Sequence, residues 1–311
     1  MVEDVEIKTT VSPFAIREGE IKTFDGKDGY VSINQIIHKI NLGHISDVHF
    51  KILDLVNEFE FLTSRQIYQL LVYRGVEIKS QDKLNTKLEQ LVKTKILTRY
   101  YFTSEEGKGI YRVYCMEKMG KYLLNSKEVE CKWQPTDNTK PVALMKKRLA
   151  GNQVILSYMR KSKNFDSYKV KTTITAKMSG KTFKGHGEVK ISKAGKSLSL
   201  IFEAVRREED WENKFVERMR LYKDFLENIV QFDSGYDARP QLILVCEDDK
   251  HMVEVFKEIV KNKLEMEKIK VYFTTDLKQN SESLDKSLTD FIKNEETGKF
   301  VAKNVEFKIL E

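Results

Sequence analysis

Residues 61–71 read FLTSRQIYQLL, residues 79–102 read KSQDKLNTKLEQLVKTKILTRYYF, and residues 107–124 read GKGIYRVYCMEKMGKYLL. Thr63 occupies an N-cap position in the first segment, and apolar residues follow it at helical spacing. Ser80 is the corresponding cap in the second segment. The apolar stripe of that second helix consists of Leu84, Leu88, Leu91 and Val92. These segments therefore predict two short amphipathic helices in succession.

Two strand-like runs follow these helices, at residues 98–102 and 110–115, and a glycine-containing turn joins them. Another amphipathic helix is expected before them, at residues 49–59. Helices followed by a hairpin in this order are typical of a winged helix-turn-helix. We therefore expect residues 46–127 to form such a domain, with residues 79–95 as its recognition helix.

The polar face of the expected recognition helix is rich in groups that contact DNA. Lysine neutralises phosphates, and the Asn85 amide presents a donor and an acceptor to base edges. A solvated helix face has a similar composition, and only the helix-turn-helix context favours DNA contact. The residues expected to bind DNA are Lys79, Lys83, Asn85, Thr86, Lys87, Lys93, Lys108 and Arg112. Of these, Lys108 and Arg112 would act from the hairpin, which is the wing.

The composition is compatible with an anionic partner. Of the 311 residues, 41% are hydrophobic and 32% are charged, and the net charge is +7. Three scattered cysteines, Cys115, Cys131 and Cys246, give no zinc-ligand spacing and favour a reducing cytoplasm. The sequence shows no signal peptide and no apolar run long enough for a membrane span, so we expect a cytoplasmic protein without a membrane partner.

The remaining sequence divides into an arm, a linker and a second domain. Residues 1–45 form the arm, with a candidate strand at 20–24 and a short helix at 31–40. Residues 128–141 are polar and contain two prolines, which predicts a linker. Residues 142–311 then change from helical to strand-like periodicity. This domain is expected to be α/β with a mixed sheet, so the whole chain is of α+β or α/β class.

The sequence of the second domain predicts five strands and four helices. The expected strands are residues 168–178, 183–191, 197–205, 241–246 and 269–274. The expected helices are residues 142–160, 210–230, 252–263 and 284–293. The run QLILVC at 241–246 is apolar throughout, as in a parallel strand that is buried on both faces.

Two carboxylates on the expected strands are candidates for a metal site. Glu188 and Glu203 are 15 residues apart, which is enough for a hairpin that brings them together. Two carboxylates can bind Mg²⁺ or Mn²⁺ and activate water for phosphodiester cleavage. His186 shares a strand face with Glu188 and is a weaker candidate ligand. Without such a site, no cofactor is expected.

The nuclease pattern for this geometry is an acid on one strand and (D/E)-x-K on the next. Here the second element is Glu203-Ala-Val205, so valine stands where the lysine is expected. Lys214 or Lys223 on the following helix could replace that lysine in space. Arg206 begins a mixed charge run at 206–210 whose simplest interpretation is a solvated helix start.

The segments quoted above, with residues 202–207 (FEAVRR) and 216–223 (VERMRLYK), resemble the replication-relaxation family of plasmids and integrative elements in Gram-positive bacteria. The resemblance covers roughly residues 48–274. It implies a winged helix joined to a domain similar to the PD-(D/E)xK restriction-endonuclease fold. It also implies DNA binding in replication initiation, DNA relaxation or relaxosome assembly for conjugation, beside a relaxase or a replication initiator. The missing lysine after Glu203 favours a nuclease-like scaffold that binds without cutting.

Three functions remain open from the sequence. The leading one is a non-catalytic accessory protein that binds double-stranded DNA. The second is a metal-dependent endonuclease or nickase that uses Glu188 and Glu203. The third is a winged-helix transcriptional regulator whose C-terminal domain is a sensor. Helix-turn-helix proteins often pair to read two half-sites, so a homodimer is compatible with each of these.

Overall fold

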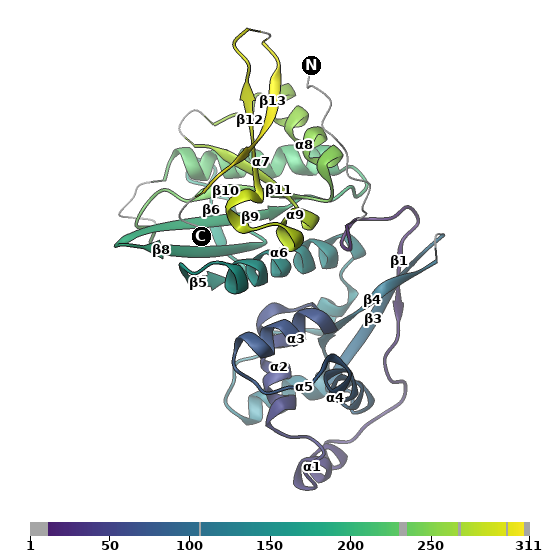
Figure 1. Cartoon of the computed structure of the whole chain (residues 1–311). Coiled ribbons are helices and arrows are strands. Elements are labelled where there is room, and N and C mark those ends of the chain that lie inside the picture. The colour runs from purple at the N-terminus through teal and green to yellow at the C-terminus, as the bar shows by residue number, and fades with distance from the viewer. Residues whose placement is uncertain (1–11, 106, 230–234, 267–268, 297, 308–311) are drawn as a thin grey trace. The chain divides into compact units, whose positions relative to one another are not determined.

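The structure is a computed structural model that describes residues 12–105, 107–229, 235–266, 269–296 and 298–307. The chain divides into two compact units, shown as ribbons in Figure 1. Residues 17–149 form the N-terminal unit. The described residues before 17 and after 149 form the C-terminal unit. The protein is a mixed α+β protein, and each unit has its own sheet.

The N-terminal unit combines helices with a small sheet. Its helices are α1 (Ile33–Asn41), α2 (Asp47–Phe59), α3 (Ser64–Tyr73), α4 (Gln81–Lys93), α5 (Lys118–Ser126) and the start of α6 (Val142–Lys161), with a 3-10 turn η1 (Pro135–Thr139). Its strands are β1 (Ile21–Phe24), β2 (Leu62–Thr63), β3 (Leu97–Ser104) and β4 (Gly107–Met116). The antiparallel sheet has the order β1-β3-β4-β2.

Side-chain caps begin several helices of this unit, and they include the predicted caps Thr63 and Ser80. Ser32 caps α1 and Thr63 caps α3, and in each case a glutamine three residues later completes a capping box. The Ser80 side chain accepts a hydrogen bond from the backbone N–H of Lys83 at the start of α4. The predicted apolar stripe of α4 is confirmed, since Leu84, Leu88, Leu91 and Val92 are all buried.

The C-terminal unit is built on a seven-stranded sheet with the order β13-β12-β11-β10-β9-β8-β5. Its sheet strands are β5 (Phe165–Lys169), β8 (Gly187–Lys193), β9 (Lys196–Ala204), β10 (Gln241–Cys246), β11 (Val271–Thr275), β12 (Leu288–Lys293) and β13 (Phe300–Val305). β6 (Thr173–Thr175) and β7 (Thr182–Lys184) form a separate two-stranded ribbon. The remaining elements are helices α7 (Trp211–Glu227), α8 (Asp249–Lys261) and α9 (Asp276–Ser281), and the turn η2 (Leu284–Lys286). Strands β9, β10 and β11 run parallel, and their neighbours on both sides are antiparallel.

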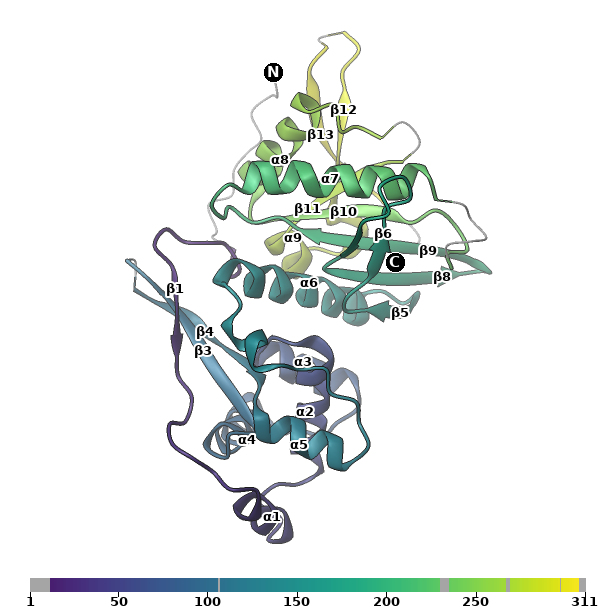
Figure 2. The same ribbon diagram turned by 180° about the vertical axis from the view of Figure 1, so that it is seen from behind.

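Helices cover both faces of this sheet, as Figures 1 and 2 show. Helices α7 and α8 pack on one face, where Met219 and Val255 join the buried cluster that contains Leu242 and Leu244. Helix α6 lies on the other face. There Tyr158 packs on Phe202 with ring centroids 5.4 Å apart. No helix in the described ranges combines the length and the apolar composition that a bilayer span requires.

Several sequence expectations differ from the structure. The helix expected at 284–293 is wrong, because Leu288–Lys293 is strand β12, paired antiparallel with β13. The single strand expected at 168–178 is divided between β5 and β6. The division between the units falls between residues 149 and 150, inside α6, whereas residues 128–141, the expected linker, belong to the N-terminal unit. The expected arm is also divided, because β1 and α1 belong to the N-terminal unit while residues 12–16 belong to the C-terminal one.

Candidate nucleic-acid interface and the carboxylates of the large sheet

Helix α4 presents the predicted DNA-binding residues on the face opposite its apolar stripe. The exposed residues of the predicted set on or just before this helix are Lys79, Lys83, Asn85, Thr86 and Lys93, and Lys87 is half-buried. Because the leucine stripe fixes the rotation of the helix against the core, the opposite face is fixed toward solvent. The structure therefore brings this part of the predicted set together on one surface.

Some polar groups on this surface already have partners. Thr86 Oγ1 donates to the backbone oxygen of Asp82 at 3.0 Å, and Asn85 Oδ1 accepts from Gln81 Nε2 at 3.1 Å. Lys93 pairs with Glu89 at 3.7 Å. In contrast, the ammonium groups of Lys79, Lys83 and Lys87 make no hydrogen bond or ion pair within the described part of the chain.

A buried histidine positions this helix, and sequence reasoning did not identify it. His49 lies on α2 and is almost fully buried. Its Nδ1 accepts from the backbone N–H of Ser46 at 3.0 Å, so Nε2 carries the proton and donates to Gln90 Oε1 at 2.9 Å. Burial lowers the pKa of His49, which keeps the ring neutral. The histidine thus joins α2 to α4 through a short hydrogen-bond chain.

In the β3–β4 hairpin, the predicted wing, Arg112 is already bound to another residue of the chain. Arg112 Nε donates to Asp25 Oδ2 at 2.6 Å, and Arg99 Nε lies 3.0 Å from the same oxygen. Lys108 lies on β4, where its backbone pairs with Thr103, and its side chain is outside what the structure describes. Arg112 is therefore held by an internal carboxylate, which competes with any external anion.

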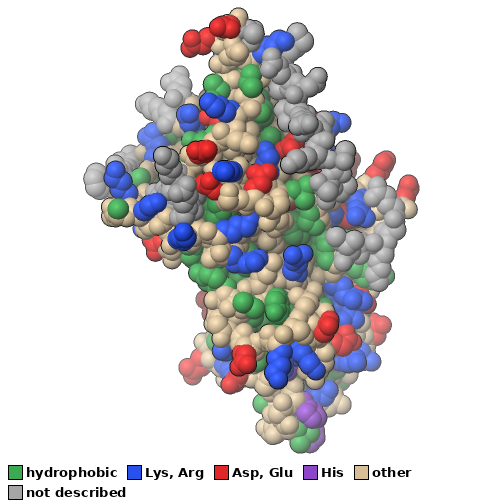
Figure 3. Space-filling view, viewed as in Figure 1, with side chains coloured by type: hydrophobic (Ala, Val, Ile, Leu, Met, Phe, Trp, Pro, Cys, Tyr) green, Lys and Arg blue, Asp and Glu red, His purple; other side chains and the backbone are tan. Residues whose placement is uncertain are grey.

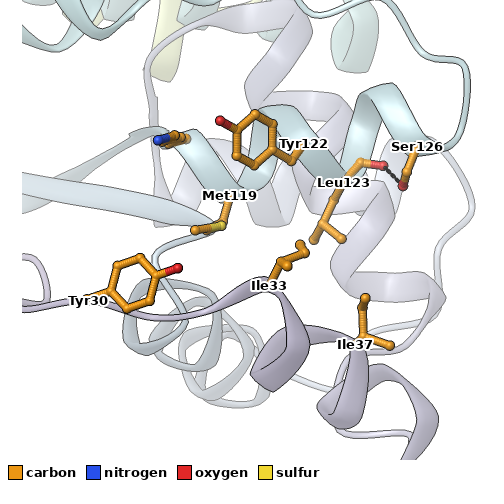
Figure 4. Close-up of a pocket in the computed structure, with 8 residues that line it drawn as sticks. Tyr30, Ile33, Ile37, Met119, Tyr122, Leu123 and Ser126 are labelled. Carbon is orange, nitrogen blue, oxygen red and sulfur yellow. Dashed lines mark hydrogen bonds between the residues drawn. The ribbon is translucent and has the colours of Figure 1, made fainter.

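A shallow apolar hollow lies between α1 and α5, drawn in Figure 4. Its volume is about 340 Å³. Its lining residues are Tyr30, Ile33, Ile37, Lys118, Met119, Tyr122, Leu123 and Ser126. The sensor alternative placed a ligand site in the C-terminal domain, whereas this hollow belongs to the N-terminal unit.

In the C-terminal unit, Glu203 is the centre of a buried polar cluster. It lies on β9 and receives two hydrogen bonds from Arg218 of α7, Nε to Oε1 and Nη2 to Oε2, both at 3.1 Å. The Tyr222 hydroxyl, one helical turn further along α7, donates to Oε2 at 2.7 Å. His186 Nδ1 lies 3.3 Å from the same oxygen. Both carboxylate oxygens are thus engaged by protein groups.

The charges in this cluster stabilise the ionised carboxylate. Burial alone would raise the pKa of Glu203, but His186 and Arg218 outweigh that effect and lower it well below the usual range. Burial raises the pKa of Tyr222, and the Glu203 charge raises it further, so the phenol remains a hydrogen-bond donor. The cluster therefore contains a permanent anion that a guanidinium neutralises.

Glu188 has its own donors, none of which contacts Glu203. Thr172 Oγ1 and Tyr236 Oη each donate to its Oε2 at 3.0 Å, and Lys169 Nζ lies 3.2 Å from Oε1. Glu188 pairs directly with Ile201 across β8 and β9. Glu203 is two residues from Ile201, so both glutamates project from the same face of the sheet. The predicted hairpin is confirmed, but the two carboxylates belong to separate hydrogen-bond networks.

The residues of the predicted metal site are engaged in other contacts. Throughout the described ranges there is no group of three histidine, cysteine or acidic side chains placed to hold a metal ion. Val205, at the position of the expected lysine, is buried in the hydrophobic core. Lys214 binds Glu208, and Lys223 binds the backbone of 263 and 265. Neither lysine replaces the missing one, and Arg218 occupies the carboxylate instead.

Sequence reasoning missed Arg218 and Tyr222 as the partners of Glu203. Their spacing of four residues places them on the same side of α7, which was the available signal. The expectation of a solvated Arg206 is also wrong, since this side chain is fully buried. Its Nη2 binds both carboxylate oxygens of Asp276, at 2.8 and 3.1 Å.

Among solved structures, the chain is similar to the restriction endonuclease FokI, with 10% sequence identity, 75% of this chain covered and a TM-score of 0.27. The similar region spans 43% of FokI. A scan against protein-family models and a search of curated proteins gave no match. The resemblance to the replication-relaxation family therefore stays a prediction.

Proposed function

We propose that this chain is a non-catalytic accessory protein that binds double-stranded DNA through α4. In this proposal residues 46–127 are a winged helix-turn-helix, α4 is its recognition helix, and the β3–β4 hairpin is the wing. The C-terminal unit is a restriction-endonuclease-like scaffold that binds without cutting.

One observation carries this proposal: the exposed face of α4, with Lys79 just before the helix, combines lysines without internal partners with an amide. Lys79, Lys83 and Lys87 have no anion bound within the described residues, so they are available to phosphates. The Asn85 amide nitrogen lies on the same face, and amides of this kind read adenine in the major groove. On the face drawn in Figure 3 basic and acidic side chains are interspersed, so the net charge alone would not select α4.

The finer biological role rests on the sequence resemblance. We propose action in plasmid or mobile-element replication initiation, DNA relaxation or relaxosome assembly, with a relaxase or replication initiator as protein partner. The non-catalytic part of the proposal is supported by Arg218, because its guanidinium already neutralises Glu203 and would repel a divalent cation there.

The test is charge reversal on α4. Lys83→Glu with Lys87→Glu should weaken binding to a duplex from the protein's own locus, measured by fluorescence anisotropy from 50 to 300 mM salt. Each lost phosphate contact lowers the slope of log K against log salt by roughly 0.9, so the double variant should lower it by about 2.

The matched control is Lys250→Glu with Lys257→Glu on α8, which changes the net charge equally at two exposed positions. This control should retain the wild-type slope. If both double variants bind alike, α4 is not the recognition helix.

A further inference from the structure

The β6–β7 ribbon of the C-terminal unit has two chemically different faces. Thr173 pairs with Lys184, Ile174 with Phe183, and Thr175 with Thr182. Because side chains alternate along a strand, Ile174 and Phe183 point to the same side, where both are buried in the core. The other side of the ribbon is left to solvent.

The outward face carries only hydroxyl and ammonium groups. Its exposed residues are Lys171, Thr173, Thr175, Thr182 and Lys184, and the connecting turn adds the exposed residues Lys177, Met178, Ser179, Gly180 and Lys181. The sequence has no acidic residue between Asp166 and Glu188. Lysine and hydroxyl side chains are among the groups that contact the phosphate backbone of DNA, so this face is chemically suited to such contacts.

The ribbon is anchored to the rest of its unit at both ends. At the turn, the Asp224 carboxylate of α7 accepts the backbone N–H groups of Met178 and Ser179, at 2.8 and 3.0 Å. At the other end, Arg218 Nη2 donates to the backbone oxygen of Lys184, and Nη2 and Nε of the same guanidinium hold Glu203. The ribbon is visible beside α7 in Figure 2. Hydrogen bonds to α7 at both ends fix the backbone that carries its lysines.

Three of these lysines are available to an external anion. The ammonium groups of Lys177, Lys181 and Lys184 make no ion pair or hydrogen bond with any residue that the structure describes. Lys169, just before the ribbon, differs because it is bound to Glu188. These three ammonium groups make the outward face of the ribbon basic, while the Asp224 carboxylate at the turn is bound to the backbone of Met178 and Ser179.

We propose that the outward face of the β6–β7 ribbon is a second contact for duplex DNA, in which Lys177, Lys181 and Lys184 bind backbone phosphates. A two-stranded ribbon has a width that fits the major groove or follows its edge. The inference deepens the proposed function, on which it rests, by assigning the C-terminal unit a DNA-binding surface of its own. The ligand is the phosphate backbone, so this contact adds affinity without sequence preference.

The experiment uses the full chain and a 40-base-pair duplex from its own locus, with anisotropy measured over a salt series. Lys177→Gln with Lys181→Gln should lower the salt slope by about 2 and the affinity by roughly tenfold per lysine near 0.1 M salt. On a duplex of scrambled sequence, the ribbon variant should lose affinity relative to wild type by the same factor. Lys250→Gln with Lys257→Gln is the control and should leave slope and affinity unchanged. Circular dichroism melts would show that all variants fold alike.

The outcomes separate this inference from the proposed function. If the α4 variant loses binding and the ribbon variant behaves as the α8 control, the ribbon contact is overturned and the α4 assignment stands. If the ribbon variant loses affinity and slope while the α4 variant does not, the ribbon contact is supported and the α4 assignment fails. A full chain that binds no duplex overturns both.

Discussion

Arg218 holds Glu203 through two parallel hydrogen bonds between α7 and β9, each 3.1 Å long. This bidentate geometry is the strongest form of a carboxylate–guanidinium pair. Because Glu203 is buried and Arg218 is largely so, each charge depends on the other for its solvation. The pair is therefore a structural feature of the C-terminal unit.

Glu203→Gln should destabilise the C-terminal unit strongly. Removing one partner of a buried pair leaves an uncompensated charge on Arg218, at a cost of about 3–5 kcal/mol. Urea denaturation would measure this, with the exposed Glu217→Gln on α7 as a control that should cost little. Equal midpoints for the two variants would show that the Arg218 charge has another partner.

The same pair has a definite pH dependence. The pKa of Glu203 in the folded protein is below its unfolded value, so the pair contributes its full stability above the unfolded pKa of about 4.3. That contribution falls as the pH drops from there through the lower, folded pKa. Wild type should therefore lose more stability than Glu203→Gln in strongly acidic buffer. Parallel losses in the two proteins would contradict an ionised Glu203.

Supercoiled plasmid carrying the native locus should be retarded and remain uncut with Mg²⁺ or Mn²⁺. The reason is that Arg218 and Tyr222 occupy the Glu203 oxygens that a metal would need. Gel shift and nicking scored on one gel measure both properties, and the shift should fade as salt rises. Metal-dependent conversion to open circle, abolished by Glu203→Ala, would instead identify a working nuclease.

Asp25→Asn should strengthen DNA binding. Asp25 holds Arg112 of the β3–β4 hairpin, the proposed wing, and the substitution frees that guanidinium and removes one negative charge. Arg99, the other partner of Asp25, keeps its ion pair with Glu89. We expect the salt slope to steepen by about 1 if Arg112 then reaches a phosphate. The control is Asp28→Asn, an exposed neighbour with the same change in charge. An identical effect of both substitutions would assign the gain to net charge alone.

The C-terminal unit should lose stability as the pH falls below 6.5 because of His251. Burial, with Arg207 and Arg206 nearby, lowers its pKa to about 3, and its Nδ1 accepts the backbone N–H of Glu247 at 3.2 Å. Between pH 6.5 and 3 only the unfolded chain binds this proton, which costs about 1.4 kcal/mol per pH unit. Above pH 6.5 the histidine is neutral in both the folded and the unfolded chain, so it does not change the stability with pH.

The measurement is urea denaturation at pH 7 and 4.5 in a Trp133→Phe background, so that the fluorescence comes from Trp211, whose ring centroid lies 5.0 Å from that of His251. His251→Asn keeps an acceptor for Glu247 and removes the titration. Wild type should lose about 3 kcal/mol more than this variant over the interval. A difference near zero would mean that the ring is not held neutral.

Local signals made the N-terminal unit predictable. Thr63 and Ser80 cap helices because their hydroxyls accept hydrogen bonds from free backbone N–H groups. These bonds join residues three apart in the chain, so they can be predicted without knowledge of the tertiary structure. The apolar stripe on α4 was likewise a local signal, because its helical spacing identifies the buried face. The strand β12 was missed because a segment as short as Leu288–Lys293, with three apolar residues among six, fits either a helix or a strand, and its pairing with β13 decides between them.

The surroundings of the carboxylates were less predictable. Alternation along a strand places Glu203 on a face, but nothing in the sequence states which helix covers that face. A search for lysine near Glu203 could not reveal that Arg218 takes its place. Asp25 and Arg112, 87 residues apart, are joined by strand pairing through β3, which likewise no local pattern encodes.

The C-terminal unit is discontinuous along the chain. Ser12 Oγ donates to the buried carboxylate of Asp276, and the backbone N–H of Ile16 donates to Glu247 Oε1 at 3.0 Å. The whole N-terminal unit is thus inserted, along the sequence, between two parts of the C-terminal unit. During synthesis the inserted unit can fold as soon as it leaves the ribosome, whereas the discontinuous unit must wait for the strands made last. The N-terminal segment of the discontinuous unit would therefore be exposed to ribosome-associated chaperones before residues 150 onward have been synthesised.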